Sequence, residues 1–386
     1  MVVHKMLTNL FHKISLKKVA YVLLLLTYIY IIVFTYLHNR KNDGYVLGDW
    51  LVNYQDGGFK RRGLSGSFFF LLQDISGVSL NTLVYVFQVI IISLFFYFYL
   101  KLIREKEITI FYLSLLFSPL GFVAYFNCVD YVGKKEFILF AIFSYFTFQI
   151  SKATLSLKKE YLVCFLLFIS VLFHEIVLFF IPYFLILLAL NDEKIVMKKY
   201  VKYLLAVFVP ATLILVFGHK INEGNSLSIL RDRGVVIKRG IFFWDINERK
   251  YILSQWKDYI LYFISFIISF LHVRFYLKTS SNQWKKIGFY LIFAFLFSLP
   301  LFILAIDWGR WFYIHMVMII IMLANYLKKT DAKKSFQTIN KNFYIALIII
   351  FFSLFYRVEM SGRGFTFQGF LYRTLIIPRE LINKML

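Results

Sequence analysis

The sequence predicts an all-α, polytopic integral membrane protein with about eleven transmembrane helices. Of its 386 residues, 60% are hydrophobic, whereas soluble domains carry roughly 45–50%. Apolar runs of about 15–20 residues recur along the chain, which is the pattern of membrane-spanning helices. The short segments of alternating polarity that are typical of a β-barrel are not visible. Because unpaired backbone groups are not tolerated in hydrocarbon, we expect the apolar runs to be helical.

The first apolar run, at about 19–37, is longer than the core of a signal peptide and lacks a small-residue cleavage site. We therefore interpret it as a retained span. Four lysines precede it, which places the N-terminus in the cytoplasm by the positive-inside rule. The expected spans are about 19–37, 81–100, 108–126, 136–151, 160–173, 176–190, 201–217, 259–277, 287–306, 311–327 and 342–356.

The stretch 160–190 is either two short spans or one long tilted helix, and the choice reverses the topology of everything that follows. We favour two spans, because this choice places the later lysine-rich loops in the cytoplasm. The chain is then a single transmembrane domain, 1–386. Its external parts are loops at about 38–80 and 218–258 and a C-terminal tail at about 357–386.

The formal net charge is +23, which in a soluble protein would indicate nucleic acid as a partner. In a membrane protein the positive-inside rule and anionic lipids explain it, and no nucleic-acid motif is present. The two cysteines, Cys128 and Cys164, are expected near opposite ends of successive helices, so no disulfide is expected between them. The sequence also contains no nucleotide-binding or zinc motif.

The arginines are distributed differently from the lysines. In this topology 21 of the 30 lysines lie inside, whereas 12 of the 14 arginines lie outside. Topology favours neither cation over the other, so the segregation needs a second cause. Arginine binds phosphate with two parallel hydrogen bonds, whereas lysine is a point charge. An external anionic ligand, such as a pyrophosphate, is one explanation, and outer-leaflet lipid head groups are another.

Four polar motifs fall on the external face, and the first follows the first span. In "GDWLVNYQDGGFKRRGL", the acids Asp49 and Asp56 precede the cations Lys60, Arg61 and Arg62. We interpret the acids as candidate catalytic groups and the cations as candidate pyrophosphate ligands. The alternative is a solvated turn that neutralises lipid phosphate. Residues 64–76 are too few to span and are predicted to form an interfacial helix.

The second motif, "NCVDYVGKKEF", places Lys134 and Lys135 in a short loop between two predicted spans. These lysines are candidate phosphate ligands, and an ion-paired interfacial loop is the alternative. The third motif, "LFHEIVLFF", places His174 and Glu175 inside an apolar stretch of about thirty residues. Ionisable groups at such depth are expensive and often functional, so a catalytic role is expected, against a structural hydrogen-bonded corner.

The fourth motif is "AIDWGRWFYIH". Asp307 is either the N-cap of the next span or a candidate catalytic acid. Arg310 is a candidate pyrophosphate ligand, because a cation is disfavoured at a helix N-terminus unless it pairs with Asp307 or binds an anion. His315 lies two turns further on, and we favour core packing for it. Arg239, in the aromatic and cationic loop 218–258, is the last candidate pyrophosphate ligand.

The segments "DGGFKRRGL", "DYVGKKE", "HE" and "DWGRW", together with the arrangement of spans and loops, resemble Wzy-type O-antigen or capsular polysaccharide polymerases. The broader class is that of GT-C-like membrane glycosyltransferases of the bacterial inner membrane. The resemblance implies a base in the first external loop, which corresponds to Asp56 or, failing that, Asp49. The acidic pair with one intervening residue that is common in that class is missing here.

The activity expected from this resemblance is polymerisation of polyprenyl-pyrophosphate-linked sugar units at the external face. An acceptor hydroxyl attacks the anomeric carbon, and pyrophosphate leaves. A carboxylate takes the proton, and cations stabilise the leaving group. No cofactor is required, although a divalent cation is possible. Expected partners are membrane lipids and other polysaccharide-assembly proteins. Inversion and retention both stay open, as do two other classes, a lipid-linked oligosaccharide flippase and a membrane O-acyltransferase.

Overall fold

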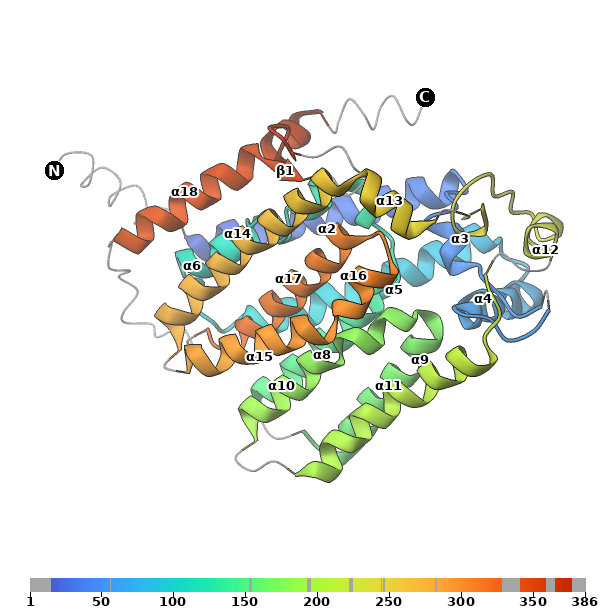
Figure 1. Cartoon of the computed structure of the whole chain (residues 1–386), viewed down its shortest axis with the longest axis horizontal. Coiled ribbons are helices and arrows are strands. Elements are labelled where there is room, and N and C mark those ends of the chain that lie inside the picture. Colours follow the sequence, from blue (N-terminus) through green and yellow to red (C-terminus); the bar gives the residue numbers. More distant parts are fainter. Residues whose placement is uncertain are drawn as a thin grey trace.

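The computed structural model describes residues 15–55, 57–152, 155–192, 196–221, 225–243, 245, 247–281, 283–327, 341–358 and 365–376. Long helices run side by side, and the short elements α3, α4 and α12 gather at one end of the bundle (Figure 1). The all-α prediction is confirmed for this part of the chain, whose strands form a single hairpin of two residues each. The elements are α2 (Leu16–Arg40), α3 (Leu47–Trp50), α4 (Gly63–Ser76), α5 (Leu80–Ile103), α6 (Ile110–Leu116), α7 (Ala124–Asn127), η1 (Val129–Tyr131), α8 (Glu136–Lys152), α9 (Leu157–Phe173), η2 (Glu175–Phe180), α10 (Ile181–Asn191), α11 (Met197–Phe217), α12 (Ser226–Asp232), η3 (Ile241–Phe243), α13 (Glu248–Ser254), α14 (Trp256–Ser280), α15 (Trp284–Phe297), α16 (Leu299–Leu304), α17 (Trp308–Ala324), α18 (Lys341–Phe355), β1 (Arg357–Val358) and β2 (Phe365–Thr366).

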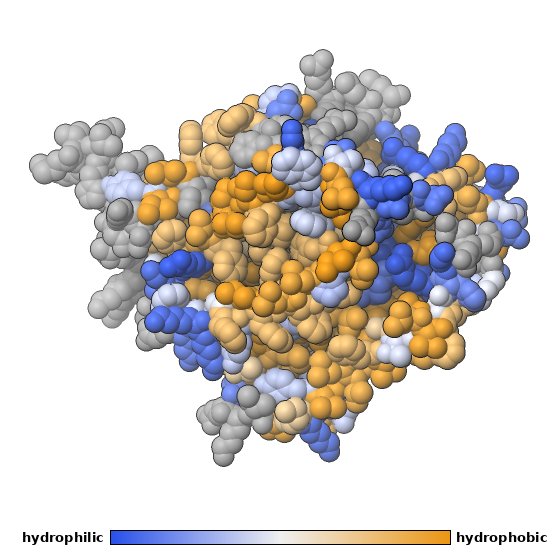
Figure 2. Space-filling view, in the orientation of Figure 1, coloured by the Kyte–Doolittle hydropathy of each residue, from blue (hydrophilic) through white to orange (hydrophobic). Residues whose placement is uncertain are grey.

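Five helical segments are long and apolar enough to cross a membrane, as the predicted membrane protein requires. Apolar residues cover the middle of the molecule, and polar residues gather around α3, α4 and α12 (Figure 2). The total of eleven spans and their orientation stay predictions. The five segments are Leu16–Arg40, Leu80–Ile103, Met197–Phe217, Tyr259–Ser280 and Trp284–Leu304.

The predicted span 108–126 is wrong as a continuous helix. Helix α6 begins after the capping hydroxyl of Thr109 and ends at Leu116. The chain then turns, with the Gly121 amide donating to the carbonyl of Ser118 at 2.8 Å, before the single turn of α7. The physical reason is Pro119, because a proline disfavours the α conformation for the residue before it. This segment is therefore a broken helix that packs inside the bundle.

The stretch 160–190 consists of two helical segments, as predicted. Helix α9 ends at Phe173, and His174 is extended, with φ −159° and ψ 113°. The chain then continues through η2 and α10. Lys199 lies 3.5 Å from Glu160 near the start of α9 and 3.0 Å from Asp192 at the end of α10. Because one lysine contacts both residues, the start of α9 lies near the end of α10, and the two segments run antiparallel.

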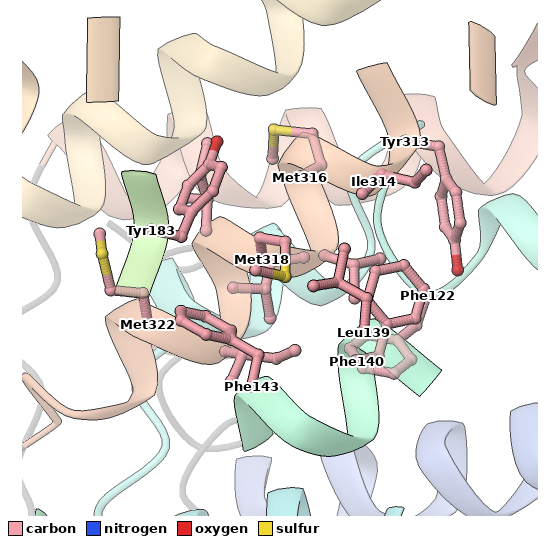
Figure 3. Close-up of a cluster of buried hydrophobic side chains, with 14 of the residues drawn as sticks. Phe122, Leu139, Phe140, Phe143, Tyr183, Tyr313, Ile314, Met316, Met318 and Met322 are labelled. Atoms are coloured by element: carbon pink, nitrogen blue, oxygen red, sulfur yellow. The ribbon is translucent and has the colours of Figure 1, made fainter. Parts of the chain in front are cut away.

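Helix α17 lies in the centre of the bundle. Every residue from Gly309 to Ala324 is buried. Its side chains pack against α8 and α10, where Phe140, Phe143 and Tyr183 surround the methionines of α17 (Figure 3). His315 is fully buried, with Nδ1 2.7 Å from the Tyr183 hydroxyl and Nε2 2.7 Å from the Ser298 hydroxyl. Both ring nitrogens therefore have partners, and the predicted packing role of His315 is confirmed.

The loop after α2 is held by close backbone contacts. Gly66 in α4 donates its amide to the carbonyl of Val52 at 2.8 Å, and a Cβ at this position would collide with the same oxygen. Gly44 and Gly240 cross so closely that a Cβ on either would overlap the other segment. This crossing places Arg239 beside Asp43, at 3.2 Å. Residues 237–243 are thereby docked on the first loop.

Labelling of a cysteine tests the orientation. The Arg239 side chain is 70% exposed at the end of the bundle that holds α3 and α4. In a background lacking Cys164, the variant Arg239→Cys is expected to react with a membrane-impermeant maleimide in intact cells, because this end is predicted to be external. Lys159→Cys, at the start of α9, is the matched control and is expected to react only after lysis. The reverse pattern would overturn the predicted topology.

Candidate functional site

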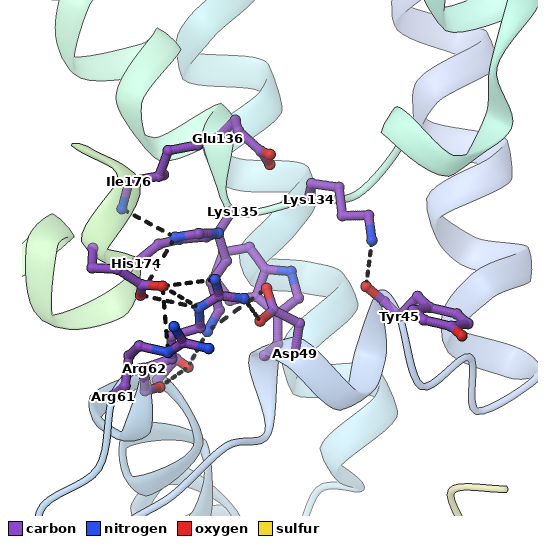
Figure 4. A network of polar contacts seen from close by, with 12 residues as sticks. Tyr45, Asp49, Arg61, Arg62, Lys134, Lys135, Glu136, His174 and Ile176 are labelled. Atoms are coloured by element: carbon purple, nitrogen blue, oxygen red, sulfur yellow. Dashed lines mark hydrogen bonds and ion pairs between the residues drawn. The ribbon is translucent and has the colours of Figure 1, made fainter. Parts of the chain in front are cut away.

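Ten polar residues meet at the end of the bundle near α3, and we call them the acid–cation cluster. Figure 4 shows the part of the cluster around Asp49, Arg62 and Lys135. They come from all four motifs that the sequence singles out. Five are cations and four are carboxylates, so the cluster carries a slight positive excess. Its members are Asp49, Arg61, Arg62, Lys134, Lys135, Glu136, His174, Glu175, Asp307 and Arg310.

Arg62 joins two carboxylates that are far apart in the sequence. Its Nη1 donates to Asp49 Oδ1 at 2.9 Å, and its Nε and Nη2 donate to Glu175 at 2.8–3.1 Å. The Arg62 side chain is only 14% exposed. Its backbone is left-handed, with φ 68°, a conformation that costs a non-glycine residue roughly 1–2 kcal/mol. These ion pairs hold the strained residue in place at the start of α4.

Lys135 is buried next to Asp49. Its side chain is fully buried, and its Nζ donates to Ser65 Oγ at 2.9 Å, 3.9 Å from Asp49 Oδ2. The Trp50 ring lies below it, with Nζ 5.6 Å from the ring centroid. Burial lowers the pKa of Lys135 from 10.5 to about 8, although Asp49 opposes the shift. Burial would raise the pKa of Asp49, but Lys135 and Arg62 hold it well below its usual range, so Asp49 is ionised at neutral pH.

The low pKa of Lys135 predicts a stability that depends on pH. Between about pH 8 and 10.5 the unfolded chain binds more protons at this lysine than the folded chain. The free energy of unfolding is therefore expected to rise as the pH increases through this window. Below the window the folded protein bears the full cost of burying the charged ammonium of Lys135. Denaturant unfolding in detergent micelles should show a smaller rise for Lys135→Met than for the wild type. A pH dependence of Lys135→Met equal to that of the wild type would refute the assignment, and Lys41→Met, at an exposed position, is the control.

Arg310 forms the second half of the cluster, at the first turn of α17. Its Nε donates to Glu136 Oε1, and its Nη1 donates to Asp307 Oδ2 at 3.2 Å. The Asp307 side chain precedes α17 without capping it, so the N-cap interpretation is wrong. Asp307 pairs with Arg310 instead, which is one of the two explanations that the sequence offered for Arg310. Glu136 is only 4% exposed, whereas Asp307 is 49% exposed. Because Glu136 follows Lys135 directly in the sequence, the half of the cluster around Arg310 adjoins the half around Asp49 and Arg62.

His174 lies in the break between α9 and η2. The Ile176 amide donates to its Nδ1 at 3.3 Å, which requires Nδ1 to be an acceptor and places the proton on Nε2. Burial, with Arg62 adding to the effect, lowers the pKa of His174 well below its usual value. His174 is therefore a neutral hydrogen-bond donor at neutral pH. The extended backbone of this residue also turns Glu175 toward Arg62.

Four buried polar atoms of the cluster make no hydrogen bond with any residue that the structure describes. They are two acceptors, Asp49 Oδ2 and Glu136 Oε2, and two donors, His174 Nε2 and Arg310 Nη2. Buried polar atoms are rarely left without a partner, so each requires an explanation. A polar ligand with hydroxyl groups and anionic oxygens would satisfy both kinds of atom. The cluster thus has unmet hydrogen-bonding capacity of both kinds.

Comparisons with known proteins add nothing to this geometry. No protein-family model, curated protein or solved structure matches the chain.

The predicted site residues separate into two groups. The cluster contains nine of the twelve, and Asp56 lies outside the described residues. Lys60 is buried beside α12, with Nζ 3.5 Å from Ser226 Oγ. Arg239 pairs with Asp43, which also contacts His38 at 3.1 Å. These contacts hold the loops that surround the cluster.

The structure adds residues that sequence reasoning did not assign to the site. Glu136 is the partner of Arg310. Its position directly after Lys134 and Lys135 in the sequence could have identified it as a site residue. Trp50 supports Lys135 and donates its indole N–H to the carbonyl of Gly133 at 2.8 Å. This bond ties α3 to the loop before α8. Nothing in the sequence indicated this hydrogen bond, because it joins residues 83 positions apart.

The described residues contain no group of three or more histidine, cysteine or acidic side chains arranged to hold a metal ion. The divalent cation that the sequence left possible stays a prediction. The described cysteines are both free, as expected. What the cluster offers chemically is an ionised carboxylate, a neutral imidazole donor and several fixed guanidinium and ammonium groups.

Proposed function

We propose that the protein is a membrane glycosyltransferase that joins sugar units carried on polyprenyl pyrophosphate, with the acid–cation cluster as its reaction centre. The observation that supports this most is the open Oδ2 of Asp49, a buried and ionised carboxylate oxygen among cations. Such an oxygen can accept the proton of an attacking sugar hydroxyl. The Asp49 pKa is low, so the proton transfer is expected late, as the leaving group departs.

The cations have different roles in this proposal. Arg62 already holds Asp49 and Glu175, so we assign it to positioning these carboxylates rather than to gripping phosphate. Arg61 is half exposed, with Nε 3.5 Å from Glu175, and is the accessible guanidinium beside them. We assign the leaving pyrophosphate to Arg61 and to the open Nη2 of Arg310. Preorganised donors of this kind lower a barrier by about 3 kcal/mol each.

The remaining assignments concern Asp307, His174 and Asp56. Asp307 is half exposed beside Arg310 and is placed to orient the acceptor sugar. His174 donates its Nε2 proton to an anionic or hydroxyl oxygen of the substrate. Asp56 is the alternative base, which the resemblance implies. Polymerisation of repeat units, inner-membrane localisation and cooperation with other polysaccharide-assembly proteins belong to the same proposal.

Two features support the transferase over the rival classes. A flippase needs a polar path between both faces, but α17, in the centre of the bundle, is buried and, beyond its first turn, apolar apart from Tyr313 and His315. Both nitrogens of His315 contact hydroxyls, which leaves it unsuited as the base of an acyltransferase, so that reaction would have to use His174.

Glycan profiling of a strain that lacks the gene tests the proposal. We expect long-chain lipopolysaccharide or capsule to be lost while single repeat units accumulate on the carrier at the external face, with the wild-type gene restoring the polymer. Units trapped on the cytoplasmic face would identify a flippase instead. Normal polymer that lacks acyl groups would identify an acyltransferase, and both results would refute the proposal.

A further inference from the structure

An apolar cavity of about 300 Å³ lies between α5, α8 and α9. Helices α5 and α9 form its walls, and Ala141 of α8 is among the residues between them. The hydroxyl of Ser170 lines the cavity but donates to the carbonyl of Leu167 at 2.8 Å, so it is already satisfied. The lining is therefore suited to hydrocarbon.

The cavity opens toward the surface that faces lipid in a membrane. Leu94 and Leu162, which line it, are 39% and 45% exposed. On α5 the lining runs from Phe87 to Phe98, which is about 16 Å at the rise of an α-helix. The cavity is thus elongated parallel to the helices, as a lipid chain would be.

One end of the cavity adjoins the acid–cation cluster. The last lining residue of α9, Phe173, is followed directly by His174 and Glu175. Phe87 stacks on Phe173, with ring centroids 6.2 Å apart, and packs edge-on against Trp50, the residue beneath Lys135. A chain in this cavity would therefore carry its head group to the cations.

The energetics decide what can occupy the cavity. A chain that moves from bilayer hydrocarbon into an apolar cavity gains no hydrophobic free energy, because lipid tails are equally apolar. Residence therefore requires that the head group be bound. The half-exposed Arg61 and the positive excess of the cluster favour a phosphate head group. The volume lies at the small end of ligand cavities, which suits one chain rather than two.

We propose that the cavity between α5, α8 and α9 binds the hydrocarbon chain of a single-chain lipid phosphate, of the polyprenyl phosphate class, whose phosphate lies at the acid–cation cluster. This inference rests on the proposed function, because it names the lipid part of the same substrate. The cavity positions the lipid, and the cluster supplies the affinity.

Photo-crosslinking tests the proposal without requiring catalysis. The purified full chain in lipid nanodiscs is irradiated with a polyprenyl phosphate that carries a diazirine near the phosphate end of its chain. Cross-links are expected in α5, α8 and α9, and unlabelled polyprenyl phosphate should compete whereas phosphatidylglycerol in excess should not. Equal competition by phosphatidylglycerol, or cross-links confined to other helices, would overturn it.

Matched variants sharpen the test. Ala141→Phe fills the cavity and is expected to reduce the cross-link about tenfold, whereas Ile90→Phe, on α5 at a 50% exposed position outside the cavity, should not. If Ala141→Phe does not fold, Leu94→Trp at the rim supplies the same comparison. An unchanged cross-link in the folded cavity variant refutes the site.

The inference and the proposed function fail separately. A competed cross-link in the cavity, combined with normal polymer in the deletion strain, keeps the lipid site and refutes the transferase. Lost polymer combined with no cavity cross-link keeps the transferase and refutes the site.

Discussion

Replacing Arg62 by methionine is expected to lower the free energy of unfolding by about 3–5 kcal/mol. The change leaves Asp49 and Glu175 without their shared partner, and both carboxylates are largely buried, at 6% and 22% exposure. Only the longer contacts of Lys135 with Asp49, at 3.9 Å, and of Arg61 with Glu175, at 3.5 Å, remain. Poorly compensated charges in a buried site are far more expensive than intact pairs. Denaturant unfolding of the purified protein in mixed micelles measures the loss.

The neighbouring arginine provides the matched control. Arg61 contacts the same Glu175, at 3.5 Å, but its side chain is 50% exposed. Ion pairs at exposed positions contribute about 0–1 kcal/mol, so Arg61→Met should unfold almost as the wild type does. In the proposed function Arg61 nevertheless touches the leaving group, so this variant should lose transfer activity while remaining stable. Equal stability of the two variants would refute the structural role of Arg62.

Replacing Asp49 by asparagine is expected to decrease transfer about 10²–10⁴-fold while the protein still folds. Asparagine has the same shape and its oxygen can accept the hydrogen bond from Arg62, but it cannot take a proton from a sugar hydroxyl. The measurement is the length distribution of polymer in the deletion strain complemented with the variant. The amount of protein in the membrane is determined in parallel, to separate loss of chemistry from loss of protein.

Two further acids of the first loop complete this series. Asp43→Asn is the matched control, because Asp43 pairs with Arg239 and His38 rather than with the cluster, and normal polymer is expected. Asp56→Asn tests the base that the resemblance implies. Normal polymer from Asp49→Asn would remove Asp49 as the base, and loss of polymer from Asp56→Asn alone would assign that role to Asp56.

The electrostatics of the cluster explain why such effects should be large. At an effective dielectric constant of about 20, two unit charges 4 Å apart interact by about 4 kcal/mol, against about 1 kcal/mol in water. Asp49 and Glu136 are 6% and 4% exposed, so water screens them little. The carboxylates and cations are fixed by one another before substrate arrives, which is the condition for electrostatic catalysis.

Much of the fold could be predicted from local pattern. The long apolar runs correspond to α2, α5 and α11, and the short helix predicted at 64–76 is α4, whereas its position at the membrane interface stays a prediction. The break between α9 and η2 was also predicted, because two spans in this stretch place the later lysine-rich loops in the cytoplasm. The break after α6 was missed, although Pro119 was a visible signal for it. Hydropathy averaged over a window does not register a single proline.

The candidate site was predictable in membership but not in pairing. Four polar motifs at the ends of apolar runs indicate groups that share one face of the membrane, and the structure brings them together. Nothing in the sequence indicated that Arg62 would bind Glu175, 113 residues away, rather than remain open. Nothing indicated that Arg310 would contact Glu136, 174 residues away.

The sequence by itself determined the fold class of the protein, most of its long helices and the polar motifs, because hydrophobicity, helical length and charge are local properties. The tertiary structure decided which cation neutralises which carboxylate, which polar atoms stay open and where an apolar cavity meets the charges. These depend on helices α5, α8, α9 and α17 packing side by side. Ion pairing falls off with distance and is set by burial, and both are defined only once distant segments are in contact.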